Sequence, residues 1–144
     1  MQLREHMSQP AIVVTPTTPV ATAMKILRDR HIRRLAVIDD GALVGIVSER
    51  DLLRAMPSPA TSLSVWEIPE LLERLLVRDV MTRDVIVVEP DAPIQQAARL
   101  MVEHKIGGLP VVEHGRVIGM VTETDIFRVF CSLFAAEEAL AATR

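Results

Sequence analysis

The alternation of apolar and polar positions predicts a short strand and then a helix near the start of the chain. Residues 12–15 form a β-branched run that stops at Pro16, and proline ends a strand because it has no N–H for the ladder. After Pro19, which suits a first helical turn, apolar side chains recur at three- and four-residue spacing. The pattern predicts an amphipathic helix that ends near His31.

A hairpin and a second helix follow. Apolar residues fill positions 35–38 and 43–47, and the dipeptide Asp40-Gly41 between them is a frequent two-residue hairpin turn. Another helix is predicted to begin at Glu49. The order of elements is therefore β-α-β-β-α.

The same pattern occurs a second time. Residues 3–55 align without a gap on residues 77–129, at a constant offset of 74, and 17 of the 53 pairs are identical. Unrelated segments of ordinary composition would share roughly three or four. A duplicated unit usually packs against its own copy. We therefore predict an α/β (α+β) fold of two β-α-β-β-α repeats about a pseudo-two-fold axis, with any site in one repeat matched in the other.

These boundaries divide the chain into four parts. Repeat one takes residues 1–56, a linker 57–76, repeat two 77–129 and a C-terminal helical extension 130–144.

Two segments outside the repeats carry helical patterns of their own. Residues 65–77 predict a short amphipathic helix, with Trp66 as the packing anchor of the linker. Residues 126–142 predict one long helix, whose apolar extension from Phe130 onward has no counterpart in repeat one. An unmatched apolar extension suggests a cap on the fold or a dimer contact.

Composition narrows the possible functions. A net charge of −3 and a pI of about 5.8 argue against a nucleic-acid binder. No apolar run is long enough to span a bilayer and no signal peptide precedes the repeats, so we expect a cytoplasmic protein without a membrane partner. The single cysteine, Cys131, excludes an internal disulfide, and its apolar helix suggests a buried position. The histidines lack metal-ligand spacing and no catalytic motif is visible, so we expect no metal site, no required cofactor and no enzyme.

One polar pattern is kept in both repeats. Ser48-x-x-Asp51 and Thr122-x-x-Asp125 each lie where a strand gives way to a helix. One interpretation is structural, because Ser/Thr-x-x-Asp resembles a capping box that satisfies the first helical N–H groups. The other is a ligand site, since a helix N-terminus suits phosphate and a nearby carboxylate can accept from ribose hydroxyls.

The repeats resemble a pair of cystathionine-β-synthase (CBS) domains, also called a Bateman module. The resemblance rests on Met-x-x-x-x-Ile-Val-Val-x-Pro at each start and on Gly-h-h-Ser/Thr-x-x-Asp at each end. Between them lie Leu-Ala-Val-Ile-Asp-Asp-Gly from Leu35 and Leu-Pro-Val-Val-Glu-His-Gly from Leu109. It covers nearly the whole chain outside the linker and the extension. It implies a regulatory module that binds an adenine nucleotide in a cleft between the repeats.

The resemblance also implies which residues line the two sites. The ligand would be AMP, ADP or ATP, with S-adenosylmethionine and NAD as further possibilities. Hydroxyls and carboxylates would hold ribose and phosphate, and the first strands and second-strand starts would border the base. The candidate binding residues are Val14, Arg33, Arg34, Leu35, Ala36, Ser48, Arg50 and Asp51 in repeat one, and Val88, Gly108, Leu109, Pro110, Thr122 and Asp125 in repeat two.

The repeats differ in charge beside these motifs. Repeat one carries Arg33, Arg34 and Arg50, whereas repeat two has Gly107, Gly108 and Thr124 at those positions. Arginines can neutralise phosphate through bidentate hydrogen bonds, so the repeat-one site is predicted to tolerate more phosphates. Alternatively these arginines form a solvated edge, with Arg30 and Arg34 pairing Asp29 and Glu49.

Two functions from different classes are therefore open. The first is a nucleotide sensor that forms a homodimer and passes a conformational change to an effector protein in trans. The second is a ligand-free scaffold in which the Ser/Thr-x-x-Asp motifs only cap helices.

Overall fold

The computed structural model describes residues 1–57 and 67–143, and the chain divides into two compact units. Unit 1 contains Met1–Pro10 and Ile86–Arg144, and unit 2 contains Ala11–Val85. Each unit has its own sheet, its own helices and its own apolar core.

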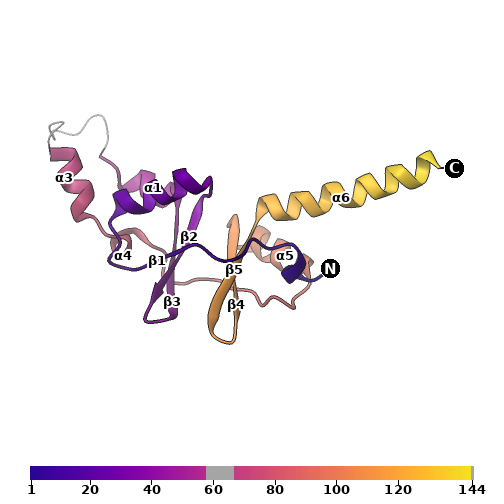
Figure 1. Ribbon diagram of the computed structural model, residues 1–144, viewed down its shortest axis with the longest axis horizontal. Coiled ribbons are helices and arrows are strands. Elements are labelled where there is room, and N and C mark those ends of the chain that lie inside the picture. The colour runs from indigo at the N-terminus through magenta and orange to yellow at the C-terminus, as the bar shows by residue number, and fades with distance from the viewer. Residues whose placement is uncertain (58–66, 144) are drawn as a thin grey trace. The chain divides into compact units, whose positions relative to one another are not determined.

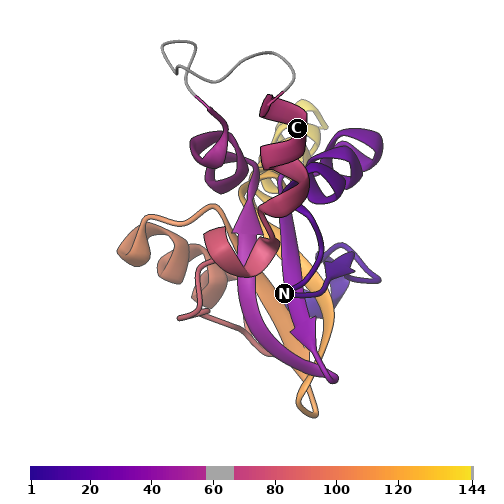
Figure 2. The same cartoon turned by 90° about the vertical axis from the view of Figure 1, so that its left-hand side faces the viewer.

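Unit 2 contains the strand–helix–hairpin–helix order predicted for repeat one, followed by two short helices. Its elements are β1 (Val13–Val14), α1 (Val20–Arg30), β2 (Arg34–Asp39), β3 (Ala42–Ser48), α2 (Glu49–Ala55), α3 (Glu67–Arg74) and α4 (Val77–Val80). The sheet has the order β1-β2-β3, with β1 parallel and β3 antiparallel to β2. The turn of the β2–β3 hairpin points away from α1 and α2 (Figures 1 and 2).

Unit 1 repeats this arrangement with one difference. Its elements are the 3-10 helix η1 (Leu3–Glu5), α5 (Ile94–His104), β4 (Gly108–Glu113), β5 (Arg116–Thr122) and α6 (Glu123–Ala142). The strand expected at residues 86–89 is reduced to one parallel bridge between Val88 and Val111. Pro110 explains this, because it has no N–H to extend the ladder, whereas repeat one has Ala36 at the matching position.

Turns and helix ends follow the sequence signals closely. The hairpin turn residues Asp40 and Gly41 both have positive φ, 50° and 81°, as a two-residue turn requires. The matching turn in unit 1 uses His114 and Gly115 with φ of 52° and 76°. Helix α1 ends at His31 in the left-handed conformation, which is the predicted end of that helix.

The linker differs from its prediction. The helix expected over residues 65–77 is split, because α3 ends at Arg74 and Leu76 is extended before α4 begins. Trp66 lies outside the described residues.

The long final helix begins at Glu123, the start predicted for the second helix of repeat two, and continues through the expected residues to Ala142. Cys131 is exposed on it, so the expectation of a buried thiol was wrong. Among its described residues only Asp125 and Val129 are buried, because the helix leaves the core of unit 1 after its first turns (Figure 1).

Each of the two cores contains residues from both sequence repeats. Leu3 and Met7, from the start of repeat one, lie in the core of unit 1 beside Val88, Leu109 and Val121. Val77, from the start of repeat two, lies in the core of unit 2, and Met81 packs against that core. The first residues of each sequence repeat therefore complete the unit that contains the other repeat's hairpin.

Candidate functional site

The Ser-x-x-Asp pattern of repeat one forms a capping box at the start of α2. The Ser48 N–H donates to Oδ2 of Asp51 at 2.8 Å, and the Asp51 N–H donates to Oγ of Ser48 at 3.2 Å. Both side chains are partly buried. The predicted capping box is therefore confirmed for repeat one. It leaves Oδ1 of Asp51 and the Ser48 hydroxyl hydrogen outside these two hydrogen bonds.

Repeat two forms a related but different arrangement at the start of α6. The Thr122 N–H donates to Oδ2 of Asp125 at 2.8 Å, and the Thr122 hydroxyl donates to the same oxygen at 3.2 Å. Asp125 is 5% exposed and is the one buried charged side chain among the described residues. Its other oxygen, Oδ1, lies 3.8 Å from the guanidinium of Arg128. The sequence interpretation missed Arg128, although its spacing of three residues from Asp125 is typical of a helical ion pair.

The register of each hairpin brings the start of the second strand to these motifs. Arg34 pairs with Ser48 across β2 and β3, and Gly108 pairs with Thr122 across β4 and β5. In each repeat the N–H of the first helical residue donates to the carbonyl of the residue just before β2 or β4. The Glu49 N–H donates to Arg33 at 2.8 Å, and the Glu123 N–H donates to Gly107 at 3.1 Å. The predicted residues at the strand starts and at the helix starts therefore lie together within each repeat.

The remaining candidate residues are placed less favourably for contact with a ligand. Leu35, Ala36, Leu109 and Pro110 lie next along the same strands and are buried. Val14 and Val88 are also buried, and they pair with Val37 and Val111 further along the sheet. The side chains of Leu35, Leu109, Val14 and Val88 belong to the two cores, so they can support a base pocket only from the core side. Ala36 and Pro110 belong to neither core cluster, because successive side chains of a strand point to opposite faces of the sheet.

Charge at the repeat-one motif is exposed. Arg33 and Arg50 are exposed, Arg34 is partly buried, and the glycines at the matching positions 107 and 108 are buried. Asp29 forms an ion pair with Lys25, with Nζ 2.6 Å from Oδ2. This hydrogen bond holds the pKa of Asp29 below its usual range.

Unit 1 also has an open pocket of about 530 Å³ at the turn end of the β4–β5 hairpin. Its polar lining comes from Glu89, Asp91, Gln96 and His114. Thr122 and Asp125 do not line it, because they lie at the opposite end of β5.

The motif geometry suits a ligand that carries adjacent hydroxyls next to a negative group. A carboxylate has about four lone-pair positions, and one oxygen of each aspartate is already fixed by the backbone. The other oxygen can accept from a hydroxyl, while the helix N-terminus favours a negative charge.

Among the described residues, no helix is long and apolar enough to cross a membrane.

The family model for the CBS domain matches the chain twice, at residues 3–58 and 77–132. The chain belongs to the CBS domain family. It is a tandem CBS pair, and its mixed helix and strand content agrees with the solved structures of other CBS pairs.

Three relatives place this CBS pair among known proteins. A CBS domain-containing protein of Dictyostelium discoideum is 36% identical over 126 residues, covering 86% of this chain and 87% of that protein. The CBS domain pair of protein MJ0100, solved with 5′-methylthioadenosine and S-adenosyl-L-methionine, has a TM-score of 0.77 at 30% identity and covers 92% of this chain and 97% of that one. CBSX2 of Arabidopsis thaliana, solved with AMP, has a TM-score of 0.76 at 34% identity, with coverages of 91% and 97%.

Proposed function

We propose that this CBS pair is a non-catalytic regulatory module that binds an adenine nucleotide, with one candidate site in each repeat. Asp51 and Asp125 accept from the ribose hydroxyls, and Ser48 and Thr122 bind ribose or phosphate oxygens beside the helix starts. AMP, ADP and ATP are the first candidates, followed by S-adenosylmethionine and NAD. The bound state is passed to a partner protein.

The observation that carries this proposal is the duplicated hydroxyl–carboxylate pair. In both repeats Oδ2 of the aspartate is held by the backbone N–H of Ser48 or Thr122 at 2.8 Å, which fixes the direction of the carboxylate. A fixed acceptor loses little freedom on binding. Two structural neighbours were solved with ligands that contain adenosine, which supports the same ligand class here.

The competing function is a ligand-free scaffold, and a specific observation favours it. In each repeat, two hydrogen bonds between the hydroxyl residue and the aspartate are sufficient to explain why both residues stand at the helix start. The two functions differ only in whether the aspartates also respond to a ligand.

A thermal-shift experiment with a matched control separates the two. The protein is heated with AMP, ADP, ATP, S-adenosylmethionine or NAD, with GTP as the non-adenine comparison. A ligand at a hundred times its dissociation constant should add about 2.7 kcal/mol of stability. Asp79 is the control residue, because its Oδ2 also accepts from a backbone N–H, that of Leu76 at 2.9 Å, but it belongs to neither motif.

Asp51→Ala, Asp125→Ala and Asp79→Ala should each lower the unliganded melting temperature through the lost backbone hydrogen bond. Only the double variant Asp51→Ala/Asp125→Ala should lose the ligand-induced shift. No shift of the unaltered protein with any adenine compound would refute the sensor and leave the scaffold.

We further propose that the protein forms a homodimer through α6. Apolar residues recur on one helix face as Ile126, Val129, Leu133, Ala136 and Leu140. The first two contact the core of unit 1, whereas Leu133 and Leu140 are 53% and 67% exposed. The same face therefore continues beyond its own core with nothing from the described residues covering it.

We assign this face to a second copy of the same chain. The stripe that Ile126 and Val129 begin against the core of unit 1 continues along α6 through Leu133 and Leu140, so two copies can bury it against each other.

A further inference from the structure

Each candidate site is built on a strand whose free edge is closed by the first residues of the other repeat. Ser8 and Met120 exchange two backbone hydrogen bonds, of 2.9 and 3.0 Å, on the edge of β5. Thr82 and Ile46 exchange two of 2.9 Å on the edge of β3. Ser8 and Thr82 occupy matching positions in the two repeats, as do Ile46 and Met120. Both bridges lie two residues before the site hydroxyl, that of Thr122 or Ser48.

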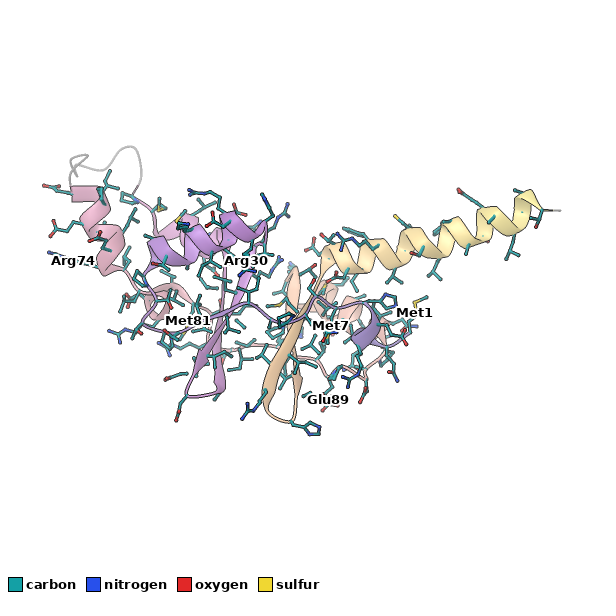
Figure 3. The ribbon with its side chains drawn as sticks, viewed as in Figure 1. Met1, Met7, Arg30, Arg74, Met81 and Glu89 are labelled. Atoms are coloured by element: carbon teal, nitrogen blue, oxygen red, sulfur yellow. The ribbon has the colours of Figure 1, made fainter. Side chains whose placement is uncertain are left out.

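Glycine makes this close approach possible. A Cβ at Gly45 would lie 2.6 Å from Sδ of Met81, and one at Gly119 would lie 2.6 Å from the carbonyl oxygen of Ser8. Figure 3 labels both methionines, with Met7 beside the β4–β5 hairpin and Met81 after α4. The two glycines therefore act as docking positions for segments 3–8 and 77–82, which we call the exchanged segments.

The exchanged segments also bind the residues just before α5 and α1. The Leu3 N–H donates to Ala92 and the Val77 N–H donates to Thr18, at 3.0 and 2.8 Å. Leu3 and Val77 are fully buried.

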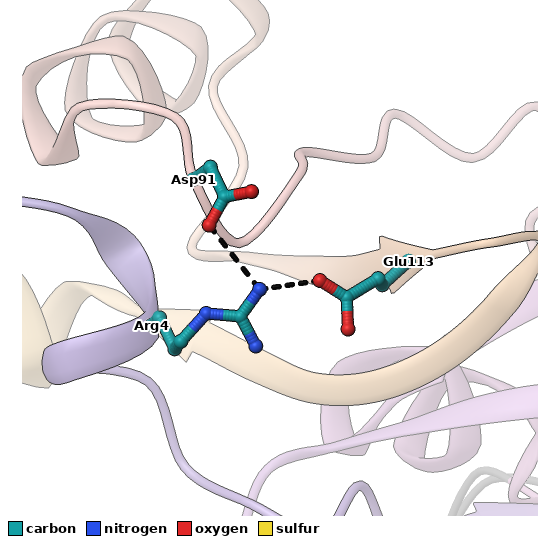
Figure 4. Close-up of polar contacts among 3 residues, drawn as sticks. All are labelled: Arg4, Asp91 and Glu113. Atoms are coloured by element: carbon teal, nitrogen blue, oxygen red, sulfur yellow. Dashed lines mark hydrogen bonds and ion pairs between the residues drawn. The ribbon is translucent and has the colours of Figure 1, made fainter.

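A side-chain contact strengthens one of the two. Arg4 bridges Asp91, at 3.2 Å, and Glu113 (Figure 4), and the hydrogen bonds to Glu113 and then Asp91 raise the pKa of its guanidinium. Each segment thus joins the helix start and the site strand of its unit.

Each exchanged segment is joined by a few residues of chain to a strand or bridge of the other unit. After Thr82 on the edge of β3, only residues 83–87 precede Val88, which pairs with Val111 in unit 1. After Ser8 on the edge of β5, residues 9–12 lead to β1 of unit 2. Only four or five residues therefore separate each edge bridge from a paired residue of the other unit.

We propose that the exchanged segments couple the two candidate sites, so that loosening or tightening the edge of one site strand changes the local stability of the other unit. The proposal rests on the proposed function for its ligand, but the coupling is present without one. Neither repeat's sequence forms a complete unit by itself, because each unit contains the exchanged segment of the other repeat.

The first arm of the test needs no ligand. Amide hydrogen exchange is followed by NMR in the full chain carrying Thr82→Pro, which removes the N–H that donates to Ile46. Exchange should become about fivefold faster at Ile46 and also at Val88 and Val112 in unit 1, the change expected from losing one hydrogen bond. Leu27→Ala is the control, because Leu27 lies in the same core, on α1, outside both the exchanged segment and the site strand.

The control should accelerate exchange within residues 11–85 alone. Acceleration by Thr82→Pro that is confined to the same residues would overturn the coupling. Ser8→Pro, with Met101→Ala as its control, gives the reciprocal pair for unit 1. Gly45→Ala displaces Met81 and Thr82 while keeping the donor, and it replaces Thr82→Pro if that variant does not fold.

The second arm adds AMP to Asp125→Ala, which retains only the repeat-one motif. AMP should slow exchange at Ile46 and, through the segment, at Val88. Slowing limited to unit 2 would refute coupling while supporting the site. Absence of any effect of AMP on the unaltered protein would refute AMP binding, and the ligand-free variants would still decide the coupling.

Discussion

Thr122 donates its hydroxyl hydrogen to Oδ2 of the buried Asp125, whereas its counterpart Ser48 accepts a hydrogen bond from the backbone N–H of Asp51. The two motifs have the same spacing but use the hydroxyl in opposite senses. In repeat two the Asp125 carboxylate is buried and forms an ion pair with Arg128 at 3.8 Å. In repeat one the Asp51 carboxylate is only partly buried. The two candidate sites are therefore not equivalent, although their sequence motifs have the same residue types at the same spacing.

This difference predicts that removing the two hydroxyls lowers the free energy of unfolding by unequal amounts. Ser48→Ala loses one cap acceptor and should cost about 1 kcal/mol of unfolding free energy. Thr122→Val keeps the shape but removes a donor to a buried charge, and should cost more, about 1–3 kcal/mol. Urea unfolding measures both, with exposed Thr124→Val as the control. Equal costs would show that the two hydroxyls have the same role.

The arginines of repeat one predict a preference for more phosphates. In an Asp125→Ala background, Arg33→Ala with Arg50→Ala should weaken ATP binding roughly 5- to 30-fold, from two exposed charge contacts of about 0.5–1 kcal/mol each, and leave AMP nearly unchanged. Isothermal titration calorimetry gives both affinities. Arg99→Ala with Arg116→Ala changes the net charge equally at exposed positions and serves as the control. Equal weakening of AMP and ATP would contradict the prediction.

The two docking glycines should tolerate alanine differently. Gly119→Ala places its Cβ against the backbone oxygen of Ser8, which can move only with its chain, and should cost about 1–3 kcal/mol. Gly45→Ala meets chiefly the flexible end of Met81 and should cost less. Thermal unfolding of the two variants ranks them. The reverse order would mean that the Ser8 segment is held more loosely than the Thr82 segment.

Dimer formation through α6 predicts a change of mass in solution. Leu133→Ser with Leu140→Ser should convert a dimer into a monomer, because both side chains lie on the proposed face of α6 and are 53% and 67% exposed in the single chain. Val102→Ser is the control, since Val102 is 78% exposed on α5 and away from this face. Sedimentation velocity distinguishes the species. A monomeric unaltered protein, or a double variant that stays dimeric, would exclude this interface.

Local signals predicted much of the fold. The hairpin turn at Asp40-Gly41, the helix end at His31 and the motif at Ser48 each depend on neighbouring residues, so they can be inferred from a few positions. The missing strand at 86–89 could have been inferred too, since a proline without an N–H stands at 110, in the strand that would have to pair with it.

Long-range contacts could not be inferred in this way. Nothing in the apolar pattern of residues 3–8 indicates that Ser8 pairs with Met120, because the pattern states which side chains seek burial and not against which partner. Arg4 and Glu113 are likewise far apart in sequence. The exposure of Cys131 depended on where α6 leaves the core, which the composition of the helix does not specify.

By itself, the sequence determined the duplication, the order of elements in each repeat and the pair of Ser/Thr-x-x-Asp motifs at Ser48 and Thr122. These follow from periodicity, turn chemistry and helix capping, which act over a few residues. Only the tertiary structure decided that the repeats exchange their first residues and that Asp125 is enclosed while Asp51 is not. The reason is that burial and edge pairing depend on which distant segments meet, and two segments with the same local pattern offer the same local signals for either partner.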